Sequence, residues 1–406
     1  MRRIGWGLLA MLMLWPLGTA AEEVMPGTEV GIEMGSQQGL EAWVQTFRPR
    51  ALAAGVAAAT FDAALRGVVF DPKVVERDRN QNEFTKTIWD YLDTAVSEDR
   101  VALGRKALAE NADLLTRIEA AYGVDREIVV AIWGLESAYG TFRGDLPVIG
   151  SLATLAYDGR RGAYFETELI AALKIVQGGH VADFRGSWAG ASGHTQFMPT
   201  SWESFAVDFD GDGRRDLWGD DPADALASTA AYLAQWGWQK AALWGLEVRL
   251  PEGFDYNQTT EAVKKPVADW AALGVVPAVG GALPDFGLAS VLLPGGARGA
   301  AFLIFANFRV IARYNTADAY VIGIGHLADR IAGGPPIAAR WPRDLRALTL
   351  EERRELQVRL GVAGFDPGGV DGRMGPKTIA AVKAFQTARG LVPDGYPSLD
   401  ILNRLP

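Results

Sequence analysis

The sequence contains no cysteine and only three histidines among 406 residues. Disulfide bonds and thiol catalysis are therefore excluded, and so is a zinc site built from cysteine and histidine ligands. Basic residues are in the minority, with 40 Lys and Arg against 49 Asp and Glu. Because nucleic-acid binding depends on neutralising phosphates, a chain with a net charge of −9 is not expected to have a nucleic-acid partner.

Long apolar runs are also missing, apart from one near the N-terminus. Arg2 and Arg3 precede an apolar stretch over residues 4–17, which is followed by small residues and then by two glutamates. This order is typical of a cleavable signal peptide, which we place at residues 1–20. The run is too short to span a bilayer comfortably, and no cysteine follows it for lipid attachment. We therefore expect an exported chain without a membrane anchor in its mature form.

The rest of the chain has the composition of a globular protein, with 49% hydrophobic and 10% aromatic residues. Apolar residues recur at helical spacing over much of residues 40–156, and again over 154–173, 224–238 and 312–331. Two short apolar segments, 289–293 and 301–305, flank a Pro-Gly-Gly turn and predict a β-hairpin. The expected fold class is mainly α (α+β), with a small β element. No strong tandem repeat is apparent.

A glutamate lies on a helix that is otherwise apolar. Asp125 is a suitable N-cap for a helix over residues 126–139, and Gly140 is a suitable end. Helical spacing places Glu136 beside Trp133 and Tyr139. An apolar environment raises the pKa of a carboxyl group, and a protonated carboxyl can donate its proton to a leaving oxygen. The alternative is a glutamate that only makes a hydrogen bond within the core or at its rim.

A second motif follows at residues 186–202, where small residues and three polar side chains precede Gln196. Such a segment lets the backbone approach a ligand closely. With residues 133–137 (Trp-Gly-Leu-Glu-Ser), 190–199 (Gly-Ala-Ser-Gly-His-Thr-Gln-Phe-Met-Pro) and 313–315 (Arg-Tyr-Asn), the chain resembles the lysozyme-like membrane-bound lytic transglycosylase B family. The resemblance covers residues 39–332, which we take as the catalytic region.

The resemblance implies cleavage of the β-1,4 bond between N-acetylmuramic acid and N-acetylglucosamine in peptidoglycan. Glu136 matches the catalytic glutamate, which would protonate the glycosidic oxygen and then deprotonate the muramoyl C6 hydroxyl, so that a 1,6-anhydro end forms without water. No cofactor is implied for catalysis. The positions that match substrate contacts are Ser187, Gln196, Tyr232, Tyr314, Asn315, Tyr320, the basic pair Arg160 and Arg161, and Tyr91. Tyr232 could equally be a core residue, and the two arginines could be ordinary surface charges.

Other functions remain open at this stage. Ordinary glycosidases use two carboxylates, and nothing marks Asp145 or Asp158 as a partner for Glu136. A single carboxylate suits an internal nucleophile, but a muramidase that uses water would look similar. A non-catalytic wall-binding scaffold is the alternative from another class. Ser192 and His194 are close in sequence but lack the pattern of a nucleophile elbow, so a serine hydrolase is disfavoured.

An acidic loop follows the second motif. Residues 208–214 place aspartates at alternate positions and a glycine at the sixth, as in the first half of a calcium loop. The loop departs from the EF-hand pattern because Gly219 stands where the bidentate glutamate belongs. The resemblance implies a shortened site, and its expected ligands are Asp208, Asp210, Asp212, the Arg214 carbonyl and Asp224. We expect a structural Ca²⁺; the alternative is an acidic surface turn.

The C-terminal residues form a separate small domain. A glycine- and proline-rich linker is expected at residues 333–345, and a Thr-Leu-Glu-Glu capping box then opens a new helix at residue 349. Residues 346–406 resemble the type 1 peptidoglycan-binding domain, a three-helix module, through their Asp-Gly, Gly-x-x-Thr and Phe-Gln elements. The expected partners are peptidoglycan glycan strands and possible wall-synthesis proteins, and the expected location is the periplasm.

Overall fold

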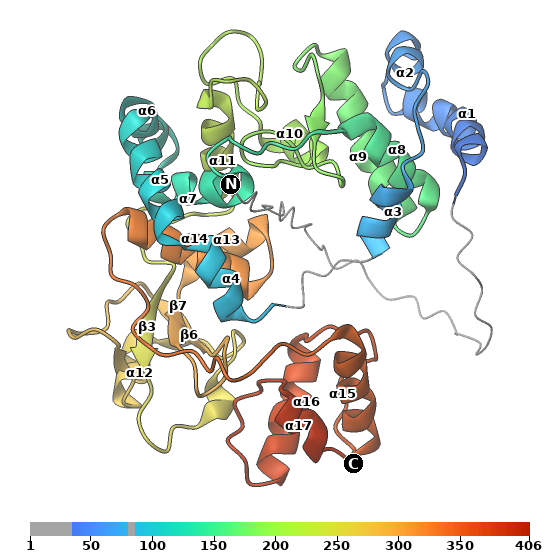
Figure 1. Cartoon of the computed structure of the whole chain (residues 1–406). Coiled ribbons are helices and arrows are strands. Elements are labelled where there is room, and N and C mark those ends of the chain that lie inside the picture. Colours follow the sequence, from blue (N-terminus) through green and yellow to red (C-terminus); the bar gives the residue numbers. More distant parts are fainter. Residues whose placement is uncertain (1–34, 80–85) are drawn as a thin grey trace, which may run out of the picture. The chain divides into compact units, whose positions relative to one another are not determined.

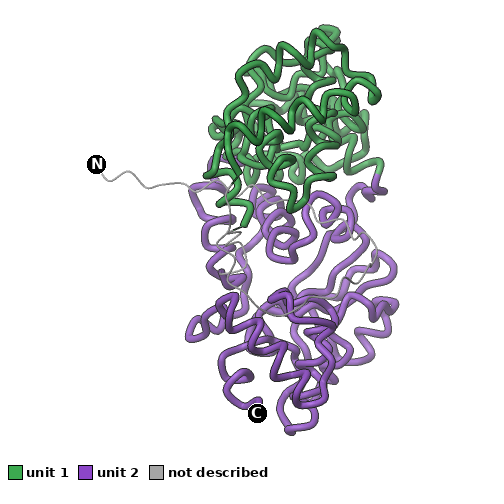
Figure 2. The backbone as a smooth tube through the Cα atoms, turned by 90° about the vertical axis from the view of Figure 1, so that its right-hand side faces the viewer, with its two compact units in different colours: residues 1–81, 107–235 green, residues 82–106, 236–406 purple. Residues whose placement is uncertain are grey.

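The computed structural model describes residues 35–79 and 86–406 (Figure 1). The predicted signal peptide lies outside the described residues. The chain divides into two compact units, one formed by residues 1–81 and 107–235 and the other by residues 82–106 and 236–406 (Figure 2). Within residues 35–79 and 86–406, no helix is both long and apolar enough to cross a membrane.

The first unit is almost entirely helical. Its elements are α1 Gln37–Ala53, α2 Ala58–Ala64, α3 Pro72–Arg79, α6 Ala112–Tyr122, α7 Arg126–Ser137, β1 Leu146–Pro147, α8 Val148–Asp158, α9 Gly162–Gln177, β2 Arg185–Gly186, α10 Pro199–Phe205 and α11 Ala223–Gln235. Helices α8 and α9 pack against each other, and α11 packs against α6 and α7. The prediction of one helix over 154–173 is wrong, because the structure has two helices there. The chain turns at Gly159, whose φ of 80° ends α8. The helix predicted over 224–238 ends earlier, at Gln235.

Helix α7, which carries Glu136, packs against α6 and α11. Residues 128–134 are all buried, as expected for a helix that is apolar on every side. The helix ends at Ser137, two residues before the predicted end, because Ala138 and Tyr139 adopt φ values of 49° and 59°. Asp125 holds the N-cap position, although its side chain makes no capping hydrogen bond. The predicted helix is therefore confirmed, but Gly140 does not end it.

The second unit contains a five-stranded antiparallel sheet in the order β4-β6-β7-β3-β5. Its elements before the C-terminal domain are α4 Ile88–Ala95, α5 Glu98–Glu110 (which continues into the first unit), β3 Gly245–Arg249, a 3-10 turn Tyr256–Gln258, β4 Lys265–Pro266, α12 Val267–Ala272, β5 Val276–Pro277, β6 Leu288–Leu292, β7 Ala301–Ile304, α13 Ala306–Tyr314 and α14 Asp318–Ile331. The predicted hairpin is confirmed as β6 and β7, with Val291 opposite Leu303. Both side chains belong to an apolar cluster around the fully buried Trp270.

The helix predicted over 312–331 is two helices. Asn315 separates α13 from α14 because its backbone is extended, with φ −156° and ψ 128°. Its side-chain Oδ1 accepts a hydrogen bond from the Ala317 N–H at 3.0 Å, a local arrangement by which asparagine competes with helical hydrogen bonding. Sequence periodicity continues across this break because apolar residues cover both helices.

The C-terminal domain consists of α15 Leu350–Val362, α16 Pro376–Ala388 and α17 Leu399–Arg404 around a small core that includes Leu356 and Phe385. The capping box of Thr349 and Glu352 is confirmed, and Pro376 is the first residue of α16. The segment over 333–345, predicted as a linker, packs against α4 within the second unit. The rings of Trp341 and Trp89 lie 6.1 Å apart, and Arg343 forms an ion pair with Asp93 at 2.7 Å.

Candidate active site

Glu136 lies in the last turn of α7, where its side chain is partly buried. The left-handed residues that end the helix fold the Tyr139 ring back over Gly134. A Cβ added to Gly134 would lie 2.6 Å from the Tyr139 Cζ, so only glycine allows this approach. The Tyr139 ring also meets the Trp133 ring edge-on, with centroids 5.9 Å apart. The end of the helix that carries Glu136 is therefore held by aromatic packing.

His194 connects this helix to the two loops that follow in sequence. Its Nδ1 accepts a hydrogen bond from Trp133 Nε1 at 3.1 Å, and its Nε2 donates to the Gly219 carbonyl at 2.8 Å. These partners define a neutral ring with its proton on Nε2. Burial lowers the pKa of His194, which is consistent with the neutral form. The Ser137 hydroxyl donates to the His194 carbonyl at 2.5 Å, so α7 is joined to the second motif by two hydrogen bonds.

Gln196 has a strained backbone and a buried side chain. Its φ is 53°, which is uncommon for a residue other than glycine and is often found at functional sites. Its Nε2 donates to the carbonyls of Gly193 at 2.9 Å and Arg143 at 3.0 Å. Among the described residues its buried Oε1 has no hydrogen-bond partner. This oxygen is available to a donor from a ligand or water.

Ser187 is also buried, at the start of the same motif. Its hydroxyl oxygen accepts from the Ala189 N–H at 3.3 Å, and its own N–H donates to the Ala191 carbonyl at 2.7 Å. Isolated bridges join Ser192 to both Gly186 and Phe197. The two predicted contacts in this motif, Ser187 and Gln196, therefore flank one compact loop.

The predicted basic pair is engaged by a buried carboxylate. Arg160 Nε lies 2.5 Å from Asp78 Oδ2, and Arg161 binds the other oxygen of Asp78, whose side chain is 1% exposed. The ion pair raises the pKa of Arg160. The Arg161 guanidinium also lies 4.7 Å from the centroid of the Phe165 ring. Two cations share one carboxylate here, so the cluster keeps positive charge while both arginines also stabilise the fold.

Tyr232 lies on α11 and is 4% exposed. Its ring packs edge-on against Phe205 and Phe197, with centroid distances of 4.7 and 6.1 Å. The Tyr232 ring therefore packs in the core, as the alternative reading of its sequence position allowed.

The remaining four candidates belong to the second unit. Tyr314 and Asn315 lie at the end of α13, Tyr320 lies on α14, and Tyr91 lies on α4. The first three are at most 5% exposed, whereas Tyr91 is partly buried. Asn315 Nδ2 is buried without a hydrogen-bond partner among the described residues, so the break between α13 and α14 presents one unsatisfied donor.

Comparison with known proteins identifies the family. Residues 39–329 match the family described as "Transglycosylase SLT domain", and residues 349–405 match "Putative peptidoglycan binding domain". The chain belongs to the transglycosylase SLT family. Membrane-bound lytic murein transglycosylase B of Escherichia coli (strain K12) is 34% identical over 251 residues, which are 60% of this chain and 66% of that relative.

Solved structures of the same family resemble this chain. SltB3 from Pseudomonas aeruginosa, in complex with NAG-anhNAM-pentapeptide, is 49% identical, with a TM-score of 0.88 over 90% of this chain and 99% of that one. The Escherichia coli lytic transglycosylase Slt35, in complex with calcium, is 30% identical, with a TM-score of 0.61 over 71% of this chain and 92% of that one. The predicted family and the mainly helical, lysozyme-like fold are confirmed.

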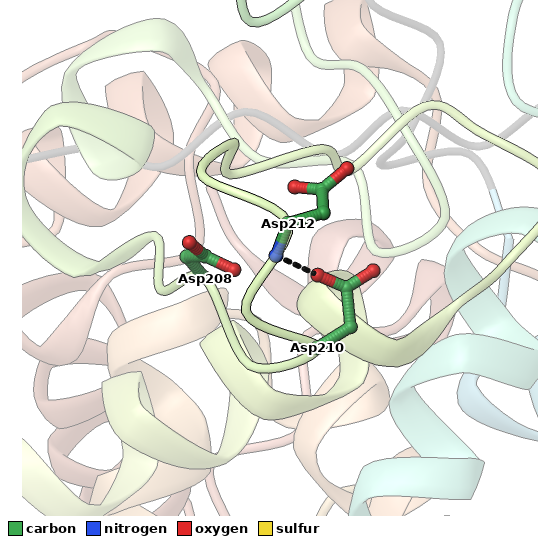
Figure 3. A group of neighbouring side chains, drawn as sticks. All are labelled: Asp208, Asp210 and Asp212. Carbon is green, nitrogen blue, oxygen red and sulfur yellow. Dashed lines mark hydrogen bonds between the residues drawn. The ribbon is translucent and has the colours of Figure 1, made fainter.

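The acidic loop brings three predicted metal ligands together. Asp208, Asp210 and Asp212 are exposed, and they offer carboxylate oxygens that lie within 4.8 Å of one another (Figure 3). Asp210 Oδ1 accepts from the Asp212 N–H at 3.0 Å, and Asp208 accepts from the N–H groups of Gly211 and Gly213 at 2.8 and 2.9 Å. An all-oxygen group of this kind fits Ca²⁺.

Asp224 is a buried carboxylate that binds main-chain N–H groups of the acidic loop and of the segment after it. It is 3% exposed, and its two oxygens accept from the N–H groups of Phe209 at 2.7 Å and Asp216 at 2.9 Å. Burial raises the pKa of Asp224, while these N–H groups oppose the shift by favouring its charged form. Asp224 is not part of the group formed by the three exposed aspartates. Arg214 follows in the loop, and its N–H donates to Asp212 Oδ1 at 2.8 Å.

Sequence reasoning assigned no role to His194 or Arg143. Arg143 Nη1 donates to the carbonyls of Trp218 at 2.7 Å and Gly219, so it supports the same loop segment that His194 binds. The carbonyls that Arg143 and His194 bind are far from both residues in the sequence, so local spacing does not predict these contacts. The one sequence feature that could have drawn attention to them is the histidine inside the second motif. Sequence reasoning also missed a fully buried glutamate, Glu168. It accepts from the Thr200 N–H at 3.0 Å and hydroxyl at 2.7 Å, so it holds the start of α10.

Proposed function

We propose that this chain cleaves the β-1,4 bond between N-acetylmuramic acid and N-acetylglucosamine and leaves 1,6-anhydromuramoyl ends. Membership of the family makes the chain a lytic transglycosylase that acts on peptidoglycan; the bond, the product and the catalytic residue are our proposal. The observation that carries it is the partly buried Glu136 at the end of an apolar, buried helix, bonded through its neighbours to the motif that contains Gln196.

In the proposed reaction Glu136 begins as a protonated acid. It gives its proton to the glycosidic oxygen as the bond from that oxygen to the muramoyl C1 breaks. The resulting carboxylate then takes the proton of the muramoyl C6 hydroxyl, whose oxygen forms the new bond to C1. The glutamate returns to its starting state, and no water is consumed. A second carboxylate is not needed because the nucleophile belongs to the substrate.

Gln196 and Ser187 are the proposed substrate contacts in the first unit. The Gln196 Oε1 supports this role, because it is a buried acceptor that lacks a partner among the described residues and suits a sugar hydroxyl or amide N–H. We retain Tyr232, Arg160, Arg161, Tyr91, Tyr314, Asn315 and Tyr320 as predicted substrate-binding residues. For the two arginines the net positive charge around Asp78 supports attraction of an acidic lactyl or peptide group.

The test is to incubate purified sacculi with the protein and weigh the released muropeptides. We expect anhydromuramoyl products, each lighter by one water than its reducing counterpart. Glu136→Gln should abolish release, because an amide cannot supply the proton. Glu127→Gln, which changes the first turn of the same helix, is the matched control and should remain active. Reducing ends would show a muramidase, and full activity of Glu136→Gln would exclude the proposed catalytic role.

We also propose that the acidic loop binds a structural Ca²⁺ through Asp208, Asp210, Asp212 and the Arg214 carbonyl, with Asp224 as the remaining predicted ligand. In the structure Asp224 instead accepts main-chain hydrogen bonds. Ca²⁺ would neutralise the exposed carboxylates and hold the acidic loop, which directly precedes the segment at Trp218 and Gly219 that His194 and Arg143 bind. Adding Ca²⁺ to an EDTA-treated sample should raise the Tm, and Asp210→Asn should reduce that rise. No change in Tm would exclude the metal.

The proposed location is the periplasm, after export through the predicted signal peptide at residues 1–20. The substrate class of the protein supports this location, because peptidoglycan lies outside the cytoplasmic membrane. Fractionation of cells that express the full chain should place a shortened, mature form in the periplasmic extract. Retention of the full-length chain in the membrane would contradict the predicted cleavage. Wall-synthesis proteins remain a predicted class of partner.

A further inference from the structure

The C-terminal domain contains two versions of one structural unit, which the sequence did not make apparent. In the first, Gln357 on α15 brackets the turn formed by Asp371 and Gly372. Gln357 Nε2 donates to Asp371 Oδ1 at 2.9 Å, and the Gly372 N–H donates back to Gln357 Oε1 at 2.7 Å. Asp371 Oδ1 also accepts from the Arg373 N–H at 2.8 Å. The next helix, α16, begins just after this turn.

The second version repeats each of these contacts. Gln386 Nε2 on α16 donates to Asp394 Oδ1 at 2.7 Å, and the Gly395 N–H donates to Gln386 Oε1 at 2.8 Å. Asp394 Oδ1 also accepts from the Tyr396 N–H at 3.0 Å. Helix α17 begins shortly after this turn. Asp371 and Asp394 are therefore equivalent positions.

The equivalence extends to a cationic side chain on each helix. Three residues before the bracketing glutamine stand Arg354 in the first version and Lys383 in the second. Each packs against the glycine of its turn: a Cβ on Gly372 would lie 3.3 Å from Arg354 Cγ, and one on Gly395 would lie 2.9 Å from Lys383 Cε. Each turn is thus flanked by one cation and one carboxylate.

In the second version this pair binds main-chain amide groups of the same chain. Lys383 Nζ donates to the carbonyls of Tyr256 and Thr259, both at 2.8 Å, and to the Thr259 hydroxyl at 2.9 Å. The outer carboxylate oxygen, Asp394 Oδ2, accepts from the Ala297 N–H at 2.9 Å. The Lys383 ammonium therefore donates to amide carbonyls, and the Asp394 carboxylate accepts from an amide N–H. This turn docks the domain on the rest of the second unit, with Lys383 only 8% exposed.

In the first version the same two groups face solvent. Arg354 and Asp371 are both exposed. Within residues 35–79 and 86–406 neither the Arg354 guanidinium nor Asp371 Oδ2 makes a hydrogen bond or an ion pair. Asp371 Oδ1 is bound as in the second version, and the charge of the neighbouring Arg373 acts on the same carboxylate. The chain therefore presents one engaged and one exposed copy of the same amide-binding arrangement.

We propose that Arg354 and Asp371 bind amide groups of peptidoglycan, with Asp371 Oδ2 accepting an amide N–H and Arg354 donating to amide carbonyl oxygens. The proposal rests on peptidoglycan being the substrate, as proposed above. Peptidoglycan offers this chemistry from two sources, the acetamido groups of its sugars and the amide bonds of its stem peptides. The docked turn shows the geometry of the interaction, because it binds the same chemical groups within the chain.

The test measures binding of the full chain to sacculi in the Glu136→Gln background, so that the wall is not degraded during the assay. Arg354→Gln combined with Asp371→Asn should weaken binding about tenfold, because two hydrogen-bonding groups are lost without a change in net charge. Arg404→Gln combined with Asp400→Asn removes an exposed ion pair on α17 and is the matched control. It should bind like the parent.

Sacculi whose stem peptides have been removed by an amidase distinguish the two sources. If the tenfold difference persists on stripped glycan, the acetamido groups are bound; if it disappears there, the stem peptides are bound. Equal binding of parent and double variant to both materials would overturn the proposal. Arg354→Gln alone is the second variant if the double variant does not fold, because Arg354 makes none of the hydrogen bonds that hold the turn, and it should weaken binding severalfold. Release of muropeptides by the chain with Glu136 intact tests the proposed function separately.

Discussion

Substitution of His194 by alanine tests whether α7, the helix that carries Glu136, depends on its connection to the following loops. The ring accepts from Trp133 Nε1 and donates to the Gly219 carbonyl, and it is 4% exposed. His194→Ala removes both hydrogen bonds, leaves a buried indole N–H without its acceptor, and opens a cavity. The perturbation therefore acts on α7 without changing Glu136 itself.

The expected cost follows from these contacts. Two buried hydrogen bonds contribute about 1 kcal/mol each, and an unsatisfied buried donor costs about 1–3 kcal/mol. With the cavity left by the ring, we expect a loss of about 3–5 kcal/mol in the free energy of unfolding at pH 8. The loss should shrink as the pH falls below about 6.5, the ordinary histidine pKa. Burial lowers the pKa of His194, so below that pH the unfolded state takes up the proton first and the parent itself loses stability.

Urea denaturation at pH 8 and pH 5 provides the measurement. His180→Ala is the control, because His180 is partly exposed and accepts only one recorded hydrogen bond, from the Arg215 N–H at 3.2 Å. It should cost about 1 kcal/mol. If His194→Ala costs no more than His180→Ala, the inferred connection between α7 and the loops is wrong. Sacculus clearing measured on the folded variant then reports whether the position of Glu136 has changed.

Three further outcomes are expected. Burial raises the pKa of Asp329 to about 7 from 3.8, so the folded state binds more protons and the carboxyl destabilises the fold as the pH rises through that window. Asp329→Asn should therefore match the parent at pH 4 and be up to about 4 kcal/mol more stable at pH 8 by calorimetry; a difference independent of pH would refute this. Gly134→Ala should cost about 1–3 kcal/mol by clashing with Tyr139, and in the Tyr139→Ala background it should cost much less. Lys383→Met should undock the C-terminal domain, which trypsin would report as faster cleavage at Arg343; an unchanged rate would contradict the docking role.

Helix α7 shows which features sequence periodicity predicts correctly and which it does not. The apolar residues from 128 to 134 predicted a helix, and the helix is confirmed, so Glu136 lies one helical turn after Trp133. The end of that helix was wrong by two residues because non-glycine residues adopt left-handed backbone angles there. That conformation is stabilised by packing of the Tyr139 ring on Gly134 and Trp133 and by the hydrogen bond from the Tyr139 N–H to the Trp133 carbonyl at 3.3 Å, and local propensity does not contain the packing.

The basic pair shows a different limit. Two adjacent arginines in a chain with excess acid are recognisable, but their partner Asp78 lies 82 residues away from Arg160. A charge pattern alone does not distinguish an arginine that binds substrate from one that neutralises a buried carboxylate. The structure shows that both arginines bind Asp78, and this contact is compatible with the predicted role in substrate binding.

The amino-acid sequence by itself determined the features that depend on neighbours three or four residues apart: the apolar helix around Glu136, the Thr349 capping box, the β6–β7 hairpin and the alternating aspartates of the acidic loop. Tertiary structure alone decided which distant groups meet, such as Trp133 with His194, and which of two equivalent turns is docked and which is exposed. The physical reason is that local hydrogen bonds and side-chain spacing act within one turn of chain. Long-range partners are selected only when the whole core packs and each buried polar group must find an acceptor or donor.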